Sequence, residues 1–165
     1  MNFQFYFEKL IASDVFGDFM KENKDAYACG GFFILDKQGN DNKQHFDYYV
    51  PSLKKIFSFK LEDGVQMIPV EMIDPRIPGK IKSNYNFDFK DVENMIQEEM
   101  NKQNINKELQ KTILSLQSLD TDGKDYLIGT VFISGLGMIK INIDISEMKF
   151  TVFEKKSFFD MLKKG

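Results

Sequence analysis

The sequence of 165 residues is poor in the residues that usually build redox, metal and anion-binding sites. It holds one cysteine, so it can form neither an internal disulfide nor a cysteine-rich zinc site. Its single histidine excludes the two-histidine helix of metalloproteases. Of its 22 basic residues only Arg76 is an arginine, and lysine lacks the planar fork that binds carboxylate or phosphate through two hydrogen bonds. The commonest signatures of these sites are therefore missing.

Charge and hydropathy narrow the class of protein further. The net charge of −3 and the lack of a basic-aromatic RNA-binding motif argue against a nucleic-acid partner. Acidic residues at Glu8 and Asp14 interrupt the N-terminal apolar stretch, and no window reaches the roughly 18 apolar residues of a membrane span. We expect no membrane segment, no cofactor and, with one unpaired thiol, a cytoplasmic location. A chain of this length and of 42% hydrophobic residues predicts a single domain over 1–165.

In the first half of the chain, hydrophobic periodicity predicts helix followed by strands. Apolar residues recur about every 3.6 positions near the N-terminus and predict a helix there, with a break near Ser13. Four runs of strand character follow, at 27–36, 44–50, 54–62 and 66–71. Pro69 in the last run predicts an edge strand or a bulge, because proline cannot donate a ladder hydrogen bond.

The second half has a less regular pattern. Residues 72–87 have no clear apolar period, and a helix capped by Asp88 or Asp91 is predicted after them. The remaining predicted elements are a second helix with the stripe Ile105, Leu109, Ile113 and Leu116, strands at 126–134, 138–145 and 149–154, and a final helix capped by Ser157 that carries Phe158, Met161 and Leu162.

Strands that occur in runs, instead of alternating with helices, indicate an α+β fold with an antiparallel sheet. We predict about seven strands with helices packed mainly on one face, in the order α-ββββ-αα-βββ-α. The clearest strand is 138–145, where isoleucines at every second position should be buried. The residues between them, Lys140, Asn142 and Asp144, should face solvent.

The two halves of the chain show a weak internal similarity. At an offset of 99 residues, two tyrosines, two glycines, two phenylalanines and two isoleucines coincide: Tyr27 and Tyr126, Gly30 and Gly129, Phe33 and Phe132, Ile34 and Ile133. This pattern is compatible with pseudo-repeats over 1–73 and 88–165. Two buried central strands with convergent composition explain it equally well.

Two patterns that could carry chemistry are incomplete. Cys29 and His45 are the one thiol and the one imidazole, but a hairpin centred near residues 39–40 places His45 opposite Ile34. Cys29 then lies roughly 16 Å away on the other face, so we expect a core cysteine and a surface histidine rather than a nucleophilic pair. Asp120, Asp122 and Asp125 resemble the start of a calcium loop.

Their glycine, however, stands at position four of that loop instead of six, and the twelfth position holds valine instead of glutamate. The Gly135-Leu136-Gly137 fragment precedes a strand where a dinucleotide-binding motif requires a helix, so it predicts a turn. We therefore expect no metal site and no dinucleotide site.

The connection over residues 72–89 is the most unusual stretch, because long connections without regular structure are uncommon in compact domains and are often functional. It combines basic and apolar side chains, and five of its residues form a candidate binding loop: Arg76, Ile77, Lys80, Lys82 and Tyr85. The alternative is a plain crossover from the edge of the sheet to the helices.

In outline the order of elements resembles roadblock-type and type III secretion chaperone-like folds, in which helices cover an antiparallel sheet and dimers are common. The resemblance is one of topology, and no residue is carried over from it. The apolar runs 27–35 and 126–133 point the same way, because a sheet that helices cover on one side leaves some of their residues exposed on the other. We therefore expect a non-catalytic interaction, scaffolding or chaperone-like module with a protein partner or a homodimer. The alternative function is a small-molecule-binding protein or enzyme that uses the 72–89 loop and the sheet face.

Overall fold

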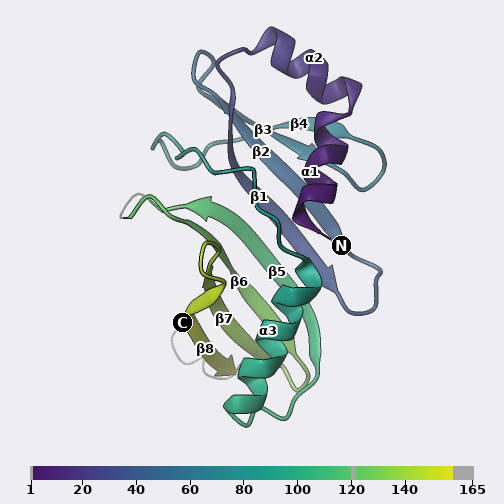
Figure 1. Ribbon diagram of the computed structural model, residues 1–165, viewed down its shortest axis with the longest axis vertical. Coiled ribbons are helices and arrows are strands. Elements are labelled where there is room, and N and C mark those ends of the chain that lie inside the picture. The colour runs from purple at the N-terminus through teal and green to yellow at the C-terminus, as the bar shows by residue number, and fades with distance from the viewer. Residues whose placement is uncertain (1, 120–121, 158–165) are drawn as a thin grey trace.

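The computed structural model describes residues 2–119 and 122–157, which form an α+β fold with one antiparallel sheet, as the sequence predicts (Figure 1). The sheet has eight strands, one more than the sequence indicated. In chain order the elements are α1 (Phe3–Ile11), α2 (Asp14–Glu22), β1 (Tyr27–Asp36), β2 (Lys43–Val50), β3 (Lys55–Lys60), β4 (Gln66–Val70), α3 (Phe89–Lys102), β5 (Leu109–Ser118), β6 (Asp125–Ile133), β7 (Gly137–Asp144) and β8 (Lys149–Ser157).

The sheet consists of two four-stranded halves that meet at its centre. Its strand order is β4-β3-β2-β1-β5-β6-β7-β8, and β1 pairs with β5 in antiparallel fashion. Figure 1 shows α1 and α2 beside the first half and α3 against the second. The edge strands are β4 and β8, so Pro69 stands in an edge strand as predicted.

Local capping sets the helix boundaries that the sequence suggested. Ser13 ends the first helix and caps the next, because its hydroxyl accepts a hydrogen bond from the backbone N–H of Phe16. Asp88 caps α3 in the same way, with its carboxylate accepting from the N–H of Lys90 at 2.8 Å. The predicted break and one of the two predicted caps are confirmed.

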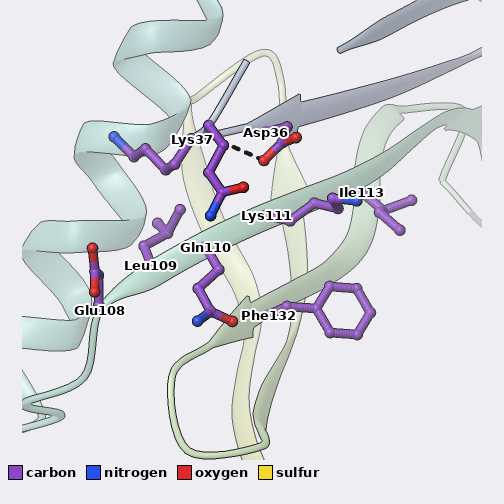
Figure 2. A pocket seen from close by; sticks show the side chains of 9 residues that line it. Asp36, Lys37, Glu108, Leu109, Gln110, Lys111, Ile113 and Phe132 are labelled. Atoms are coloured by element: carbon purple, nitrogen blue, oxygen red, sulfur yellow. Dashed lines mark hydrogen bonds between the residues drawn. The ribbon is translucent and has the colours of Figure 1, made fainter. Parts of the chain in front are cut away.

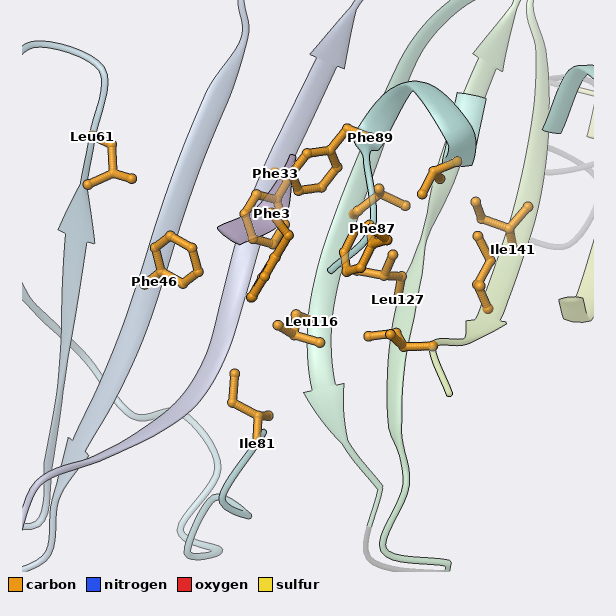
Figure 3. Close-up of a cluster of buried hydrophobic side chains, with 14 of the residues drawn as sticks. Phe3, Phe33, Phe46, Leu61, Ile81, Phe87, Phe89, Leu116, Leu127 and Ile141 are labelled. Atoms are coloured by element: carbon orange, nitrogen blue, oxygen red, sulfur yellow. The ribbon is translucent and has the colours of Figure 1, made fainter. Parts of the chain in front are cut away.

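One hydrophobic core lies between the helices and one face of the sheet (Figure 3). Residues of all three helices, among them Phe3, Phe19 and Ile96, are buried in it together with alternate residues of the strands. In β7 the alternation is as predicted: Ile139, Ile141 and Ile143 are fully buried. Antiparallel sheets commonly pack one face in this way and leave the other without helices.

Two of the three polar residues of β7 that were predicted to face solvent are more buried than expected. Lys140 is exposed as predicted, but Asn142 is half-buried. Asp144 is buried instead of exposed. It accepts hydrogen bonds from the hydroxyl and the N–H of Ser146, and Lys124 Nζ lies 3.4 Å from its carboxylate. Local hydrogen bonds therefore allow a carboxylate to be buried where the alternation placed solvent.

The predicted second helix is wrong, because that segment forms β5. After α3 the chain leaves the helical conformation at Asn104, whose φ of 57° is left-handed. In β5 the buried positions alternate at Thr112, Leu114 and Leu116, whereas Ile113 faces the other side of the sheet. The residues Leu109, Ile113 and Leu116 matched a helical spacing by coincidence, since short apolar segments satisfy both periods.

The position of β5 also bears on the internal similarity. An offset of 99 residues superposes β1 on β6, whereas β5 is the strand that follows α3 as β1 follows α2. The coincident residues therefore do not occupy equivalent places in the two halves, and a duplication stays a prediction. The predicted helix after Ser157 lies outside the described residues, and Ser157 itself ends β8.

Candidate functional site: the helix-free face of the sheet

The face of the sheet that the helices do not cover carries apolar side chains at its centre. Five of them are half-buried and are named here the apolar stripe: Phe32, Ile113, Ile128, Phe132 and Met138. The strand register places them on one face, because Phe32 stands opposite Ser115 and Ser115 opposite Ile128, while Phe132 stands opposite Met138. Phe32, Ile128 and Phe132 belong to the continuous apolar runs of β1 and β6, from which the sequence predicted exposed apolar residues, whereas Ile113 stood in the segment predicted as a helix.

Lysines surround the apolar stripe on the same face. The lysine rim consists of Lys43, Lys111, Lys140 and Lys156, whose cross-strand partners are Ile34, Phe132, Thr130 and Met138. Asp41 lies 3.0 Å from Lys111 and 3.7 Å from Lys43, and Glu154 lies 3.8 Å from Lys156. Asp36 is a third carboxylate here, because it stands opposite Lys111 in the neighbouring strand. The four ammonium groups of the rim thus stand among three carboxylates, which leaves a small local excess of positive charge although the whole chain has a net charge of −3.

At one end of the central strands the stripe continues into a hollow of about 610 Å³ (Figure 2). Ile113 and Phe132 line it together with polar side chains from the end of β1 and the start of β5. Asp36 lies at its margin and accepts a hydrogen bond from the N–H of Gln38 at 3.1 Å. The stripe is therefore bordered by a recess as well as by charge.

A second hollow, of about 590 Å³ and named here the loop hollow, lies at the other end of β1. The sheet contributes Cys29, Asp47 and Ile56, and residues 71–79 of the long connection line the opposite side. The connection is fixed at this point: the Tyr27 hydroxyl donates to the Pro78 carbonyl at 2.6 Å, and the Ile81 N–H donates to the Ala28 carbonyl at 3.0 Å.

Cys29 and His45 are separate groups, and neither matches its predicted environment in full. Cys29 is the extra residue of an irregularity in β1, is half-buried and lines the loop hollow instead of the core. Burial, with a smaller contribution from the charge of Asp47, raises the pKa of its thiol to about 12. A thiol with this pKa stays protonated at neutral pH and is a poor nucleophile.

His45 stands opposite Phe32, not opposite Ile34 as the predicted turn implied. Its side chain is only 13% exposed, so the expectation of a surface histidine is wrong. Its Nε2 lies 2.7 Å from Glu62 Oε1, although not in hydrogen-bonding alignment. Burial lowers the pKa of the imidazole, and the nearby Glu62 partly opposes that shift.

Asp47 is a functional candidate that the sequence did not reveal. It stands opposite Gly30 and Ser58 in the neighbouring strands and lines the loop hollow. Burial raises the pKa of its carboxyl group, while a hydrogen bond with the Ser58 side chain and the nearby His45 oppose that shift. Its alternation with His45 was visible in the sequence, but the connection that partly encloses it was not.

The structure does not bring the five residues of the candidate binding loop together. Arg76 and Ile77 line the loop hollow, and Lys80 is exposed beyond it. Lys82 and Tyr85 lie past the edge of the hollow, near Asp125: the Lys82 N–H and the Tyr85 hydroxyl both donate to one oxygen of the Asp125 carboxylate. Arg76 is itself paired with Asp74, with 2.6 Å between Nη2 and Oδ2.

Asp125 therefore anchors the long connection. Asp122 accepts a hydrogen bond from the Tyr126 hydroxyl at 2.6 Å, and Asp120 lies outside the described residues. Within residues 2–119 and 122–157, no group of three or more histidine, cysteine, aspartate or glutamate side chains is arranged to hold a metal ion. None of the helices in this described part is long and apolar enough to cross a bilayer.

No family model matches the chain, and no curated protein and no solved structure matches it either. The likeness to roadblock-type and chaperone-like folds is thus confined to the order of elements. The functional conclusions below depend on the geometry of the helix-free face alone.

Proposed function

We propose that this protein is a non-catalytic interaction module whose helix-free sheet face binds a protein segment rich in apolar and acidic residues. The observation that supports it is the apolar stripe, which lies half-buried in the middle of a sheet with lysines beside it. Apolar area gathered on one open surface is typical of docking surfaces. Complementary charge around it guides a partner and sets its orientation.

The charge of the lysine rim favours another protein over a second copy of this chain. A symmetric dimer through this face would place the same surface on both sides, so the rim of one copy would meet the rim of the other. Repulsion between like charges disfavours that contact, whereas glutamates or aspartates of a partner segment relieve it. The test must therefore distinguish binding of a different protein from a homodimer through the stripe.

The chemistry of the face agrees with a binding role. The Cys29 thiol is held protonated, and His45 is half-buried beside Glu62, so neither is poised as a nucleophile or a mobile base. We further propose a cytoplasmic setting, because a single half-buried thiol suits a reducing compartment. We propose no nucleic-acid partner, because the chain has a net charge of −3.

The test is fluorescence anisotropy of the whole chain with two labelled peptides, one alternating glutamate and phenylalanine and the other alternating lysine and phenylalanine. We expect the acidic peptide to bind at least about tenfold more tightly, with an affinity that falls as salt rises. Phe132→Glu should weaken that binding by at least about tenfold. Phe5→Glu is the matched control, because Phe5 is exposed on α1, on the helical side.

Sedimentation at micromolar concentration completes the test. A monomer that binds the acidic peptide supports the proposal. A dimer that Phe132→Glu dissociates, and that does not bind the peptide, assigns the face to self-association instead. Equal binding of both peptides, or a loss of binding in Phe5→Glu as large as in Phe132→Glu, contradicts a specific acidic partner.

A further inference from the structure

The loop hollow differs in charge from the rest of the helix-free face. Among its lining residues the acidic side chains are Asp47, Glu71 and Asp74, and the one basic side chain is Arg76. Arg76 already donates to the Asp74 carboxylate from its backbone N–H at 2.9 Å, from Nε to both oxygens at 2.9 and 3.1 Å, and from Nη2 at 2.6 Å. Among residues 2–119 and 122–157 no lysine lines the hollow, although every other basic residue of the chain is a lysine. Its lining therefore has an excess of negative charge.

The remaining lining is apolar or neutral. Ile56 comes from β3, and Met72, Ile77 and Pro78 come from the long connection. Side chains of Ser115, Gln117 and Ser118 in β5 supply neutral hydrogen-bonding groups. An open recess of several hundred cubic ångströms that combines apolar walls with polar groups has the size of a site for small molecules.

Asp47 is the charged group that the sheet itself contributes to this hollow. Gly30 stands beside it in β1, and a Cβ atom at Gly30 would lie 3.9 Å from Asp47 Oδ2. Because residue 30 is glycine, it places no side chain beside this oxygen. The carboxylate has about four lone-pair sites, so the hydrogen bond with Ser58 leaves others available.

We propose that the loop hollow binds a small organic cation, a primary ammonium group attached to an apolar or aromatic body. The Asp47 carboxylate accepts hydrogen bonds from the ammonium group, and the body packs against Ile56, Met72 and Ile77. The surplus of acidic lining residues attracts a cation over an anion. A cation beside a half-buried carboxylate also offsets the cost of removing that charge from water.

The site is largely formed before a ligand arrives. The hydrogen bonds from Tyr27 to Pro78 and from Ile81 to Ala28 hold the connection over the sheet. Past the hollow, the Lys82 N–H donates to Asp125 at 2.8 Å and fixes the next part of the segment. A ligand therefore orders little additional chain, which removes one of the main costs of binding.

The experiment is calorimetric titration of the whole chain with three probes of similar shape: 2-phenylethylammonium, the neutral 2-phenylethanol and the anionic 3-phenylpropanoate. We expect the ammonium probe to bind at least about tenfold more tightly than the other two. Asp47→Asn should reduce that affinity by at least about tenfold. Asp91→Asn should leave it unchanged, because Asp91 is exposed on α3.

Ile77→Ala provides a second variant that keeps the fold, since Ile77 is 71% exposed. It should weaken the ammonium probe several-fold through lost apolar contact. Equal affinity for the three probes, tighter binding of the anion, no detectable heat at about 10 mM probe, or unchanged affinity in Asp47→Asn overturns the proposal.

The two proposed surfaces can be separated with the same variants. Phe132→Glu should leave binding of the ammonium probe unchanged, and Asp47→Asn should leave binding of the acidic peptide unchanged. If the unaltered chain binds the ammonium probe but not the acidic peptide, the proposed function is wrong and the cation site stands. If it binds the acidic peptide but not the ammonium probe, the cation site is wrong and the proposed function stands.

Discussion

The two halves of the sheet have the same order of elements, a helical segment followed by four strands, but they are packed with different side chains. In the first half, aromatic rings fill the space between α1, α2 and the strands: the Phe59 ring lies 5.4 Å from that of Phe16 and 5.0 Å from that of Phe19. In the second half the buried strand residues are mainly aliphatic, with Ile139, Ile141 and Ile143 fully buried.

The helices explain the difference. α1 and α2 have nine residues each, about 13 Å long, and are broken at Ser13, whereas α3 runs for 14 residues, about 21 Å. The two short helices contribute mainly rings to the core, namely Phe3, Phe16 and Phe19. Beyond Phe89 in its first turn, the long helix contributes the aliphatic side chains of Val92, Ile96 and Met100. The comparison shows that similar topologies can be stabilised by different packing.

The largest expected effect comes from the glycines. A Cβ at Gly129 in β6 would lie 1.9 Å from the Ile113 carbonyl oxygen, so Gly129→Val should cost at least about 3 kcal/mol or prevent folding. Gly17 in α2 has no atom within 4 Å of such a Cβ, so Gly17→Ala should stabilise the protein by about 0.5–1 kcal/mol. Urea unfolding followed by circular dichroism measures both, and a cost below about 1 kcal/mol for Gly129→Val contradicts the close strand contact.

The next effect tests the packing itself. Ile143→Ala should cost about 2–5 kcal/mol and Phe59→Ala about 3–5 kcal/mol, since both side chains are fully buried. The conservative changes distinguish the halves: Phe59→Leu should cost more than Ile143→Leu, because leucine cannot replace ring contacts with Phe16 and Phe19. Chemical unfolding is the measurement, and a cost below about half a kcal/mol for Ile143→Ala would contradict the register of β7.

A smaller effect is expected at the junction of the halves. Thr112 in β5 is fully buried in the core, and within the described part of the chain its hydroxyl has no hydrogen-bond partner. Thr112→Val removes this unpaired group at nearly constant size and should stabilise the protein by about 1 kcal/mol. An unchanged or lower free energy of unfolding would show that the hydroxyl is satisfied, for instance by a bound water.

The smallest effect concerns pH. The pKa of Asp47 is raised in the folded protein by burial, so its ionised form is disfavoured there. Its contribution to stability is fully present below the unfolded pKa, near 3.9, and is lost as pH rises through the folded value. Asp47→Asn should therefore be more stable than the original protein at pH 7, with a difference that shrinks towards pH 3. A lower stability of the variant at pH 7 would contradict the raised pKa.

Periodicity in the sequence was sufficient for most of the fold. Local spacing predicts the first helix with its break at Ser13, the strands of the first half and the isoleucine face of β7. It does so because residues that recur at the period of a helix or strand lie on one face of it, and that face is turned either to the core or to solvent. β5 was missed because Leu109, Ile113 and Leu116 match a helical spacing, and only its pairing with β1 and β6 decides for a strand.

The candidate sites divide in the same way. The amino-acid sequence by itself determined the part of the apolar stripe that lies in β1 and β6, since apolar residues on both faces of these strands cannot all be covered by helices on one side. Ile113 joined the stripe only through the strand pairing of β5. It also identified Arg76 and Ile77 within an unusual connection. Only the tertiary structure decided that this connection crosses the sheet beside Cys29 and Asp47 and that Lys82 and Tyr85 lie elsewhere. The physical reason is that the path of a connection is fixed by distant anchors, here the Tyr27 hydroxyl and the Asp125 carboxylate, which no local pattern encodes.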